Sequence, residues 1–193
     1  QGDLALFDAP AIELKNNRIS SKALDNRAGM AAVIMAAKKI ATQNPKSKVV
    51  LLFPTGEELG LRGARVSAYD IPADECIVVD VSFGDCMEVP ASKTAKLGSG
   101  AMIGISPVLD KNIYNKLKRL AKENGIPFTL EVMGGATSTD ADVITLTRSG
   151  IPSGLISIPL RNMHTPAEVV DINDVKAVAN LIAAYVEGGG LNG

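Results

Sequence analysis

The chain is poor in the residues that build covalent frameworks or reactive sulfur sites. It has no tryptophan, one histidine and two cysteines among 193 residues. The two cysteines, Cys76 and Cys86, can form neither a disulfide framework nor a CxxC metal motif. Cys76 opens an apolar run, which is typical of a small core residue. We therefore expect the protein to work in a reducing, cytoplasmic environment.

Long apolar runs and an excess of charge of one sign are also missing. Twenty Lys and Arg balance 21 Asp and Glu, for a net charge of −1, so neither nucleic acid nor an anionic membrane surface is expected as a partner. No apolar stretch approaches the roughly 20 residues of a membrane helix. With 46% hydrophobic residues the bulk of the chain is not disordered. We expect a single domain over residues 1–193.

Short apolar runs alternate with helical patterns, which predicts an α/β fold. Branched residues bounded by Gly, Pro or Asp favour buried strands at 49–53, 76–79, 101–105 and 154–158. The 3.6-residue period favours helices at 30–41, 113–120 and 175–186, with a fourth running from Ser138 or Thr139 to Gly150. Asn16-Asn17 marks a hairpin turn between 12–14 and 18–20. The expected architecture is a three-layer α/β/α sandwich with a mostly parallel sheet.

Acidic residues and the single histidine fall where such a sheet gathers its functional groups, at the carboxyl ends of its strands. Glu57 and Glu58 follow the run 49–53, Asp80 follows Val79, and His164 follows the run 154–158, while Asp25 precedes the first helix. Taken one by one, Asp25 could cap its helix, the glutamates could be solvated, and the histidine could be a packed residue. Their convergence on one sheet edge favours a site.

The residue types indicate metal-dependent hydrolysis. No Gly-x-Ser-x-Gly motif accompanies His164, which disfavours a serine nucleophile, and the adjacent side chains of Glu57 and Glu58 diverge, unlike a glycosidase pair. Carboxylates with one imidazole suit a divalent metal, with zinc or cobalt favoured. One of two adjacent glutamates can then bind metal while the other takes a proton from a metal-bound water, as in two-metal hydrolysis.

Six motifs span nearly the whole chain, at residues 23–29, 57–64, 79–82, 134–141, 150–152 and 158–166. In their order and spacing the chain resembles the metallo-aminopeptidases that include glutamyl and deblocking aminopeptidases, among them tetrahedral self-compartmentalising enzymes. The endoglucanase activity sometimes assigned to such sequences does not fit the divergent glutamates.

The resemblance implies a zinc-peptidase-like catalytic domain that removes N-terminal residues from peptides with two divalent ions. By position, Asp25 corresponds to a carboxylate that bridges the two metals, and Glu57 to the general base. Glu58 and His164 correspond to ligands of one metal, and Asp80 to a ligand of the other. The resemblance also implies a large homo-oligomer for the full-length form.

The chain departs from the family pattern at its start. Family members carry an N-terminal histidine ligand and then an inserted β domain, and neither is in this sequence, so we expect a catalytic domain truncated at its N-terminus. One metal site keeps Asp25, Glu58 and His164, whereas the other keeps Asp25 and Asp80. The expectation is a chain that binds one metal better than the other and is a poor peptidase. Another dinuclear amide hydrolase, such as a deacylase, or an inactive, metal-poor fragment are the alternatives.

Overall fold

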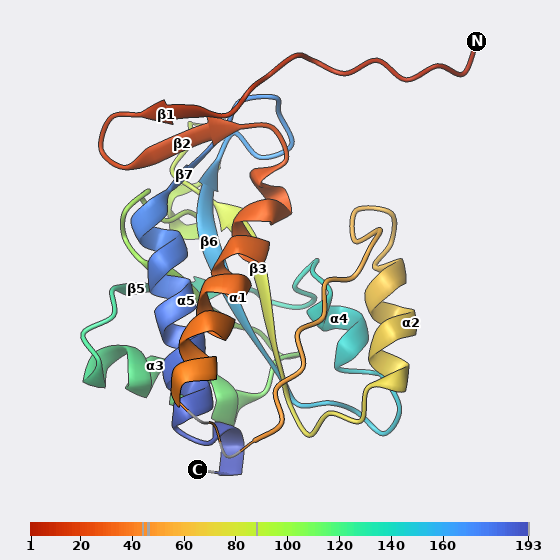
Figure 1. Ribbon diagram of the computed structural model, residues 1–193, viewed down its shortest axis with the longest axis vertical. Helices are drawn as coiled ribbons and strands as arrows, with labels where there is room; N and C mark the ends of the chain where they lie inside the picture. The colour runs from red at the N-terminus through yellow and green to blue at the C-terminus, as the bar shows by residue number, and fades with distance from the viewer. Residues whose placement is uncertain (44, 46, 88, 193) are drawn as a thin grey trace.

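A mixed sheet lies between two layers of helices (Figure 1). The computed structural model describes residues 1–43, 45, 47–87 and 89–192. The described part of the chain forms seven strands in one sheet. Their bounds are β1 Ile12–Leu14, β2 Arg18–Ser21, β3 Cys76–Phe83, β4 Ala101–Ile105, β5 Phe128–Val132, β6 Ser153–Arg161 and β7 Glu168–Asp171.

Strand β6 is the centre of this sheet. One edge of β6 pairs with β3 over residues 153–160. The other edge pairs with β4 near Ile156 and with β7 near Leu160. Strand β5 continues the sheet from β4, and β2 and β1 continue it from β7. Because β6 touches three strands, the residues that follow it lie at the middle of the sheet edge.

Among the described residues, three helices cover one face of the sheet and two cover the other. Helices α1 (Leu24–Gln43), α3 (Lys111–Glu123) and α5 (Ile172–Glu187) share one apolar core, to which β6 contributes Ile156. Helices α2 (Arg62–Asp70) and α4 (Ala141–Ile144) share the second core, to which β6 contributes Leu155. Neighbouring strand residues point to opposite faces, so the three-layer α/β/α prediction is confirmed. Two 3₁₀ turns, Ala91–Lys93 and Gly190–Asn192, complete the elements.

Several local predictions are confirmed. The hairpin joins β1 and β2, and its turn residues Asn16 and Asn17 both have positive φ, at 63° and 58°, as a tight turn of this type requires. Helix α3 buries its predicted apolar residues and ends before Asn124. Helix α5 and strands β3, β4 and β6 contain the predicted segments.

The prediction of a mostly parallel sheet is wrong. Pairs β3–β6 and β4–β5 are parallel, but β1–β2, β2–β7, β6–β7 and β4–β6 are antiparallel. The connection 162–167 between β6 and β7 holds no helix, and so short a link forces its two strands to run in opposite directions. Strands β5 and β7 and helix α2 were not expected from the apolar pattern.

The predicted strand at residues 49–53 is also wrong. This segment has no strand assignment, and Val50, Leu51 and Phe53 are partly exposed. A strand needs a hydrogen-bonded neighbour, and no ladder in the described part of the chain includes this run. The segment therefore reaches Glu57 as an extended chain outside the sheet.

Two helices differ in detail from their predictions. Helix α1 buries Ala28, Ala32, Ala36 and Ile40, whereas Met30, the first residue of the predicted range 30–41, is 45% exposed. The small alanine side chains let α1 pack against α5. Helix α4 is a single short turn with Asp140 as its N-cap, not a helix from Ser138 or Thr139 to Gly150. The hydroxyl of Thr145 bonds back to the carbonyl oxygen of Ala141, a contact that competes with helix propagation.

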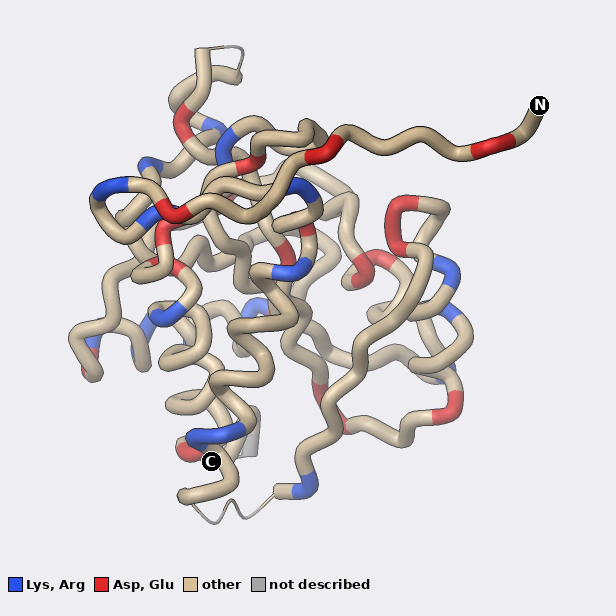
Figure 2. The backbone as a smooth tube through the Cα atoms, turned by 45° about the horizontal axis from the view of Figure 1, so that its top comes forward, with Lys and Arg blue, Asp and Glu red and all other residues tan. Residues whose placement is uncertain are grey.

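Positive and negative residues are interspersed along the fold. Figure 2 shows Lys and Arg scattered among Asp and Glu along the backbone, in agreement with the net charge of −1. Among the described residues, no helix is long and apolar enough to cross a membrane.

A buried carboxylate joins helix α5 to the loop before β4. Asp174, in the first turn of α5, accepts the N–H groups of Gly98 and Gly100, each at 2.7 Å, and is fully buried. Burial is the largest cause that raises the pKa of Asp174 to about 6; the two N–H donors and Arg18 act in the opposite direction, and Asp171 acts in the same one.

This pKa predicts a stability that falls as the pH rises. Below pH 3.8 the Asp174 carboxyl is protonated in both the folded and the unfolded chain, and between 3.8 and about 6 the folded chain binds more protons. The free energy of unfolding therefore decreases across this range, by up to about 3 kcal/mol for this group. Urea unfolding at pH 4 and pH 7 tests this: the wild type is expected to lose more stability than Asp174→Asn, and an equal loss would contradict it.

Candidate metal centre

Asp25 is held at the start of helix α1 by contacts with the sheet. It lies in the turn after β2, and its φ and ψ of −77° and 109° are not helical. The peptide bond to Asn26 is cis. The side chain of Asn26 donates to the carbonyl oxygen of Val79 at 2.8 Å and accepts from the N–H of Gly29 at 3.1 Å. The first bond fastens the Asp25 turn to β3, and the second holds the Asn26 side chain against the first turns of α1.

Glu57 and Glu58 lie in the loop between the extended run 49–53 and helix α2. The carbonyl oxygen of Glu57 accepts the N–H groups of Gly60 and Leu61. Leu61 has φ of 58°, in the left-handed region. This tight turn presents the Glu58 side chain at the surface, 60% exposed.

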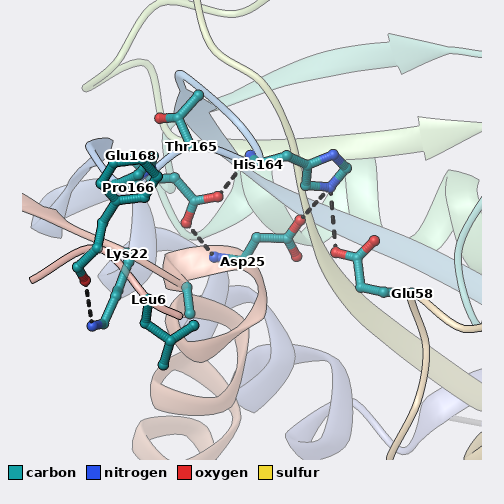
Figure 3. A pocket seen from close by; sticks show the side chains of 10 residues that line it. Leu6, Lys22, Asp25, Glu58, His164, Thr165, Pro166 and Glu168 are labelled. Carbon is teal, nitrogen blue, oxygen red and sulfur yellow. Dashed lines mark hydrogen bonds and ion pairs between the residues drawn. The ribbon is translucent and has the colours of Figure 1, made fainter. Parts of the chain in front are cut away.

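His164 lies in the connection between β6 and β7 and completes a cluster with Asp25 and Glu58. Its Nε2 is 3.1 Å from Oδ2 of Asp25 and 3.3 Å from Oε1 of Glu58. Figure 3 shows the imidazole pointing toward both carboxylates. One ligand atom from each of the three residues lies within 4.8 Å of the other two. Three segments far apart in the sequence thus bring three predicted site residues together.

The donor set of this cluster fits a divalent metal ion. One imidazole nitrogen and carboxylate oxygens are ligands that zinc binds in proteins. Desolvation is the largest cause that raises the pKa of Asp25 to about 6, and the Glu58 charge adds to it, while His164 acts in the opposite direction. The cluster therefore concentrates negative charge that a cation would neutralise.

Glu57 does not belong to this three-residue cluster, but the charges of the cluster act on its carboxyl group. Desolvation, followed by the charges of Asp140, Glu58 and Asp25, raises the pKa of Glu57 to about 7. A carboxylate with a pKa near neutrality is suited to exchange protons with a reacting group.

Asp80 lies inside strand β3 rather than after its end. Its side chain is buried, and its Oδ1 accepts the N–H of Val81 at 2.8 Å. Burial is the largest cause that raises the pKa of Asp80 to about 8, and the charges of Asp25 and Glu57 contribute. Its position is close enough for these charges to act, but it is not one of the three clustered donors. Its role as a metal ligand stays a prediction.

An open pocket of about 390 Å³ lies beside the cluster. Asp25, Glu58 and His164 form part of its wall, together with Leu6 and Lys22. The remaining lining residues are Phe7, Ala23, Thr165, Pro166 and Glu168. The Nζ of Lys22 donates to the carbonyl oxygen of Phe7 at 3.0 Å, which ties the N-terminal segment to the pocket rim.

Two buried acids near the site were not among the predicted residues. Asp140, in the motif at 134–141, is buried, and its Oδ1 has no hydrogen-bond partner. Glu168 begins β7 and is 2% exposed. A charged residue that opens a short apolar run is the only mark that the sequence offers for Glu168.

Comparisons with known proteins show which family the sequence is similar to. A sequence profile described as M42 glutamyl aminopeptidase matches residues 1–181. A protein of Acetivibrio thermocellus is 37% identical over 189 residues, which are 96% of this chain and 56% of that protein. The lysyl aminopeptidase of Pyrococcus furiosus is 29% identical over 186 residues, 96% of this chain and 53% of the enzyme.

Solved structures of aminopeptidases share the fold. Aminopeptidase APDkam598 from the archaeon Desulfurococcus kamchatkensis superposes with a TM-score of 0.85 at 33% identity, over 96% of this chain and 53% of that one. PhTET1-12s, described as a dodecamer, superposes with a TM-score of 0.80 at 27% identity, over 94% and 54%. The chain spans about half the length of the relatives it matches.

Proposed function

The chain belongs to the M42 glutamyl aminopeptidase family, and from this we propose that its residues 1–193 form a catalytic domain of a metal-dependent aminopeptidase. The Asp25–Glu58–His164 cluster is the observation that carries the proposal. Its substrates are peptides with a free N-terminus. The relatives named as lysyl and glutamyl aminopeptidases support this substrate class.

The candidate site residues divide two tasks in this proposal, metal binding and proton transfer. Asp25, Glu58 and His164 would hold one zinc or cobalt ion, and Asp25 and Asp80 would contribute to a second. A divalent ion there supplies a Lewis acid for the peptide carbonyl and lowers the pKa of water. Glu57 accepts the proton of the attacking water and passes it to the leaving amine, first as a base and then as an acid.

The assembly proposed for the full-length protein follows the relatives. The structure described as a dodecamer and another described as a tetrahedron or octahedral shell support a homo-oligomer for the full-length protein. A cytoplasmic location is consistent with the two free cysteines.

Metal content and substrate choice test the proposal together. Elemental analysis after chelator-free purification is expected to find one divalent ion held firmly and the second weakly. Hydrolysis of aminoacyl-p-nitroanilides is expected to exceed hydrolysis of their N-acetylated forms, because the free amine is part of the recognised group. Preference for the acylated forms would favour a deacylase. Absence of both metal and turnover would favour an inactive fragment.

A further inference from the structure

Glu168 connects the backbones of two residues in the candidate metal centre. Its Oε2 accepts the N–H of Asp25 at 3.1 Å, and its Oε1 accepts the N–H of His164 at 2.8 Å. Figure 3 shows the carboxylate between these two residues, with its bonds going to their main chains. Each oxygen of Glu168 therefore meets one of the segments that carry a proposed metal ligand.

The secondary structure explains why Glu168 can reach both segments. It is the first residue of β7, and its partner in the β2–β7 ladder is Ser21, which lies just before the Asp25 turn. His164 lies four residues before Glu168 in the connection from β6. The antiparallel ladder thus places one buried side chain next to both turns.

Both N–H groups need an acceptor that regular structure does not supply. Asp25 lies in the first turn of α1, where N–H groups lack a partner within the helix. His164 has φ of 61°, a left-handed conformation that non-glycine residues adopt only when their surroundings hold it. Glu168 meets both needs from a position that is 2% exposed. Hydrogen bonds donated to an ionised acceptor are stronger than those between neutral groups.

The chemistry of the contact requires a carboxylate. Two N–H donors face two oxygens, so an amide in this place would turn its NH₂ group toward one of the donors. Neither oxygen belongs to the group of clustered metal-ligating atoms. Glu168 therefore acts on the centre through the backbones of Asp25 and His164.

We propose that Glu168 is a positioning residue that holds Asp25 and His164 at the separation a divalent ion requires. The inference rests on the proposed metal centre. With this carboxylate in place, Nε2 of His164 and Oδ2 of Asp25 stay 3.1 Å apart before an ion arrives. Without it, each backbone turn can relax independently, and the ion must bind while ordering both.

The experiment compares Co²⁺ binding by the 193-residue chain, Glu168→Gln and Asp174→Asn, with titration by visible absorption. Glu168→Gln is expected to weaken Co²⁺ binding by about 10–100-fold and to alter the absorption bands, as loss of a residue that orients metal ligands does. Asp174 is a matched control, because it too is a buried carboxylate that accepts two backbone N–H groups. Asp174→Asn is expected to bind Co²⁺ as the wild type does, although it loses stability.

Circular dichroism spectra show which variants are folded, and only folded variants are compared for Co²⁺ binding. If Glu168→Gln does not fold, Glu168→Asp provides the test, because it keeps the charge but shortens the side chain; weaker binding than the wild type supports the proposal. Equal Co²⁺ affinity in the wild type and a folded Glu168 variant overturns this inference and leaves the metal centre standing. No binding by the wild type overturns the metal centre, and the positioning role with it.

Discussion

Replacement of Glu57 by glutamine is expected to lower the rate of peptide hydrolysis by about 10²–10⁴-fold, the contribution typical of a general base. Glutamine keeps the shape of the side chain but cannot accept a proton. Glu57 is not one of the three clustered donors, so metal content is expected to stay unchanged. The measurement is kcat on an aminoacyl-p-nitroanilide, with elemental analysis of the same samples.

The control replaces a glutamate by glutamine at a position outside the candidate site. Glu13 is exposed on strand β1, and Glu13→Gln is expected to keep the full rate. Full activity in Glu57→Gln would remove Glu57 from the mechanism. Loss of metal together with activity would assign Glu57 to metal binding instead.

Replacement of His164 by alanine is expected to weaken metal binding by at least about 100-fold. His164 supplies the one nitrogen donor of the cluster and lies 3.1 Å from one carboxylate and 3.3 Å from the other. Loss of a direct ligand is expected to exceed the 10–100-fold effect of residues that only orient ligands. Titration with Zn²⁺ against a chromophoric chelator measures the change.

NMR of the wild type gives an independent measurement of the proposed contact between His164 and the metal ion. The chain has a single histidine, so its imidazole NMR signals are assigned without ambiguity and are expected to shift on addition of Zn²⁺. Asn162→Ala is the matched control for His164→Ala in the Zn²⁺ titration, and it is expected to bind Zn²⁺ as the wild type does. Asn162 lies in the same connection, is exposed and has φ of 59°. Equal Zn²⁺ affinity in His164→Ala and the wild type would exclude His164 as a ligand.

Local features of the fold were predictable because neighbouring residues determine them. The 3.6-residue period of α3 and the Asn16-Asn17 turn identify their structures without reference to the rest of the chain. The convergence of Asp25, Glu58 and His164 was predicted, but the rule on which it rests holds only for Asp25 and His164, which follow strands β2 and β6 of the sheet. Glu58 joins them from a run that lies outside the sheet. Their bridging and ligand roles came from family resemblance and stay predictions.

Long-range contacts explain what the sequence did not reveal. The run 49–53 has the composition of a strand, but strand formation depends on a neighbour, and composition does not show whether one is present. The contact of Glu168 with Asp25 joins residues 143 positions apart and uses a backbone N–H. Such a contact leaves no mark in the residue type of its partner, so neither motif nor periodicity could predict it.

The three segments that carry Asp25, Glu58 and His164 differ in how firmly the fold holds them. Asp25 and His164 are fastened through Glu168 and Asn26, whereas Glu58 follows a run that lies outside the sheet. An ion bound by all three residues would link the turns of Asp25 and His164, which have higher local stability, to the segment of Glu58, which has lower local stability. Linkage makes this coupling reciprocal: any contact that orders residues 49–58 raises metal affinity, and the ion stabilises that contact by the same factor.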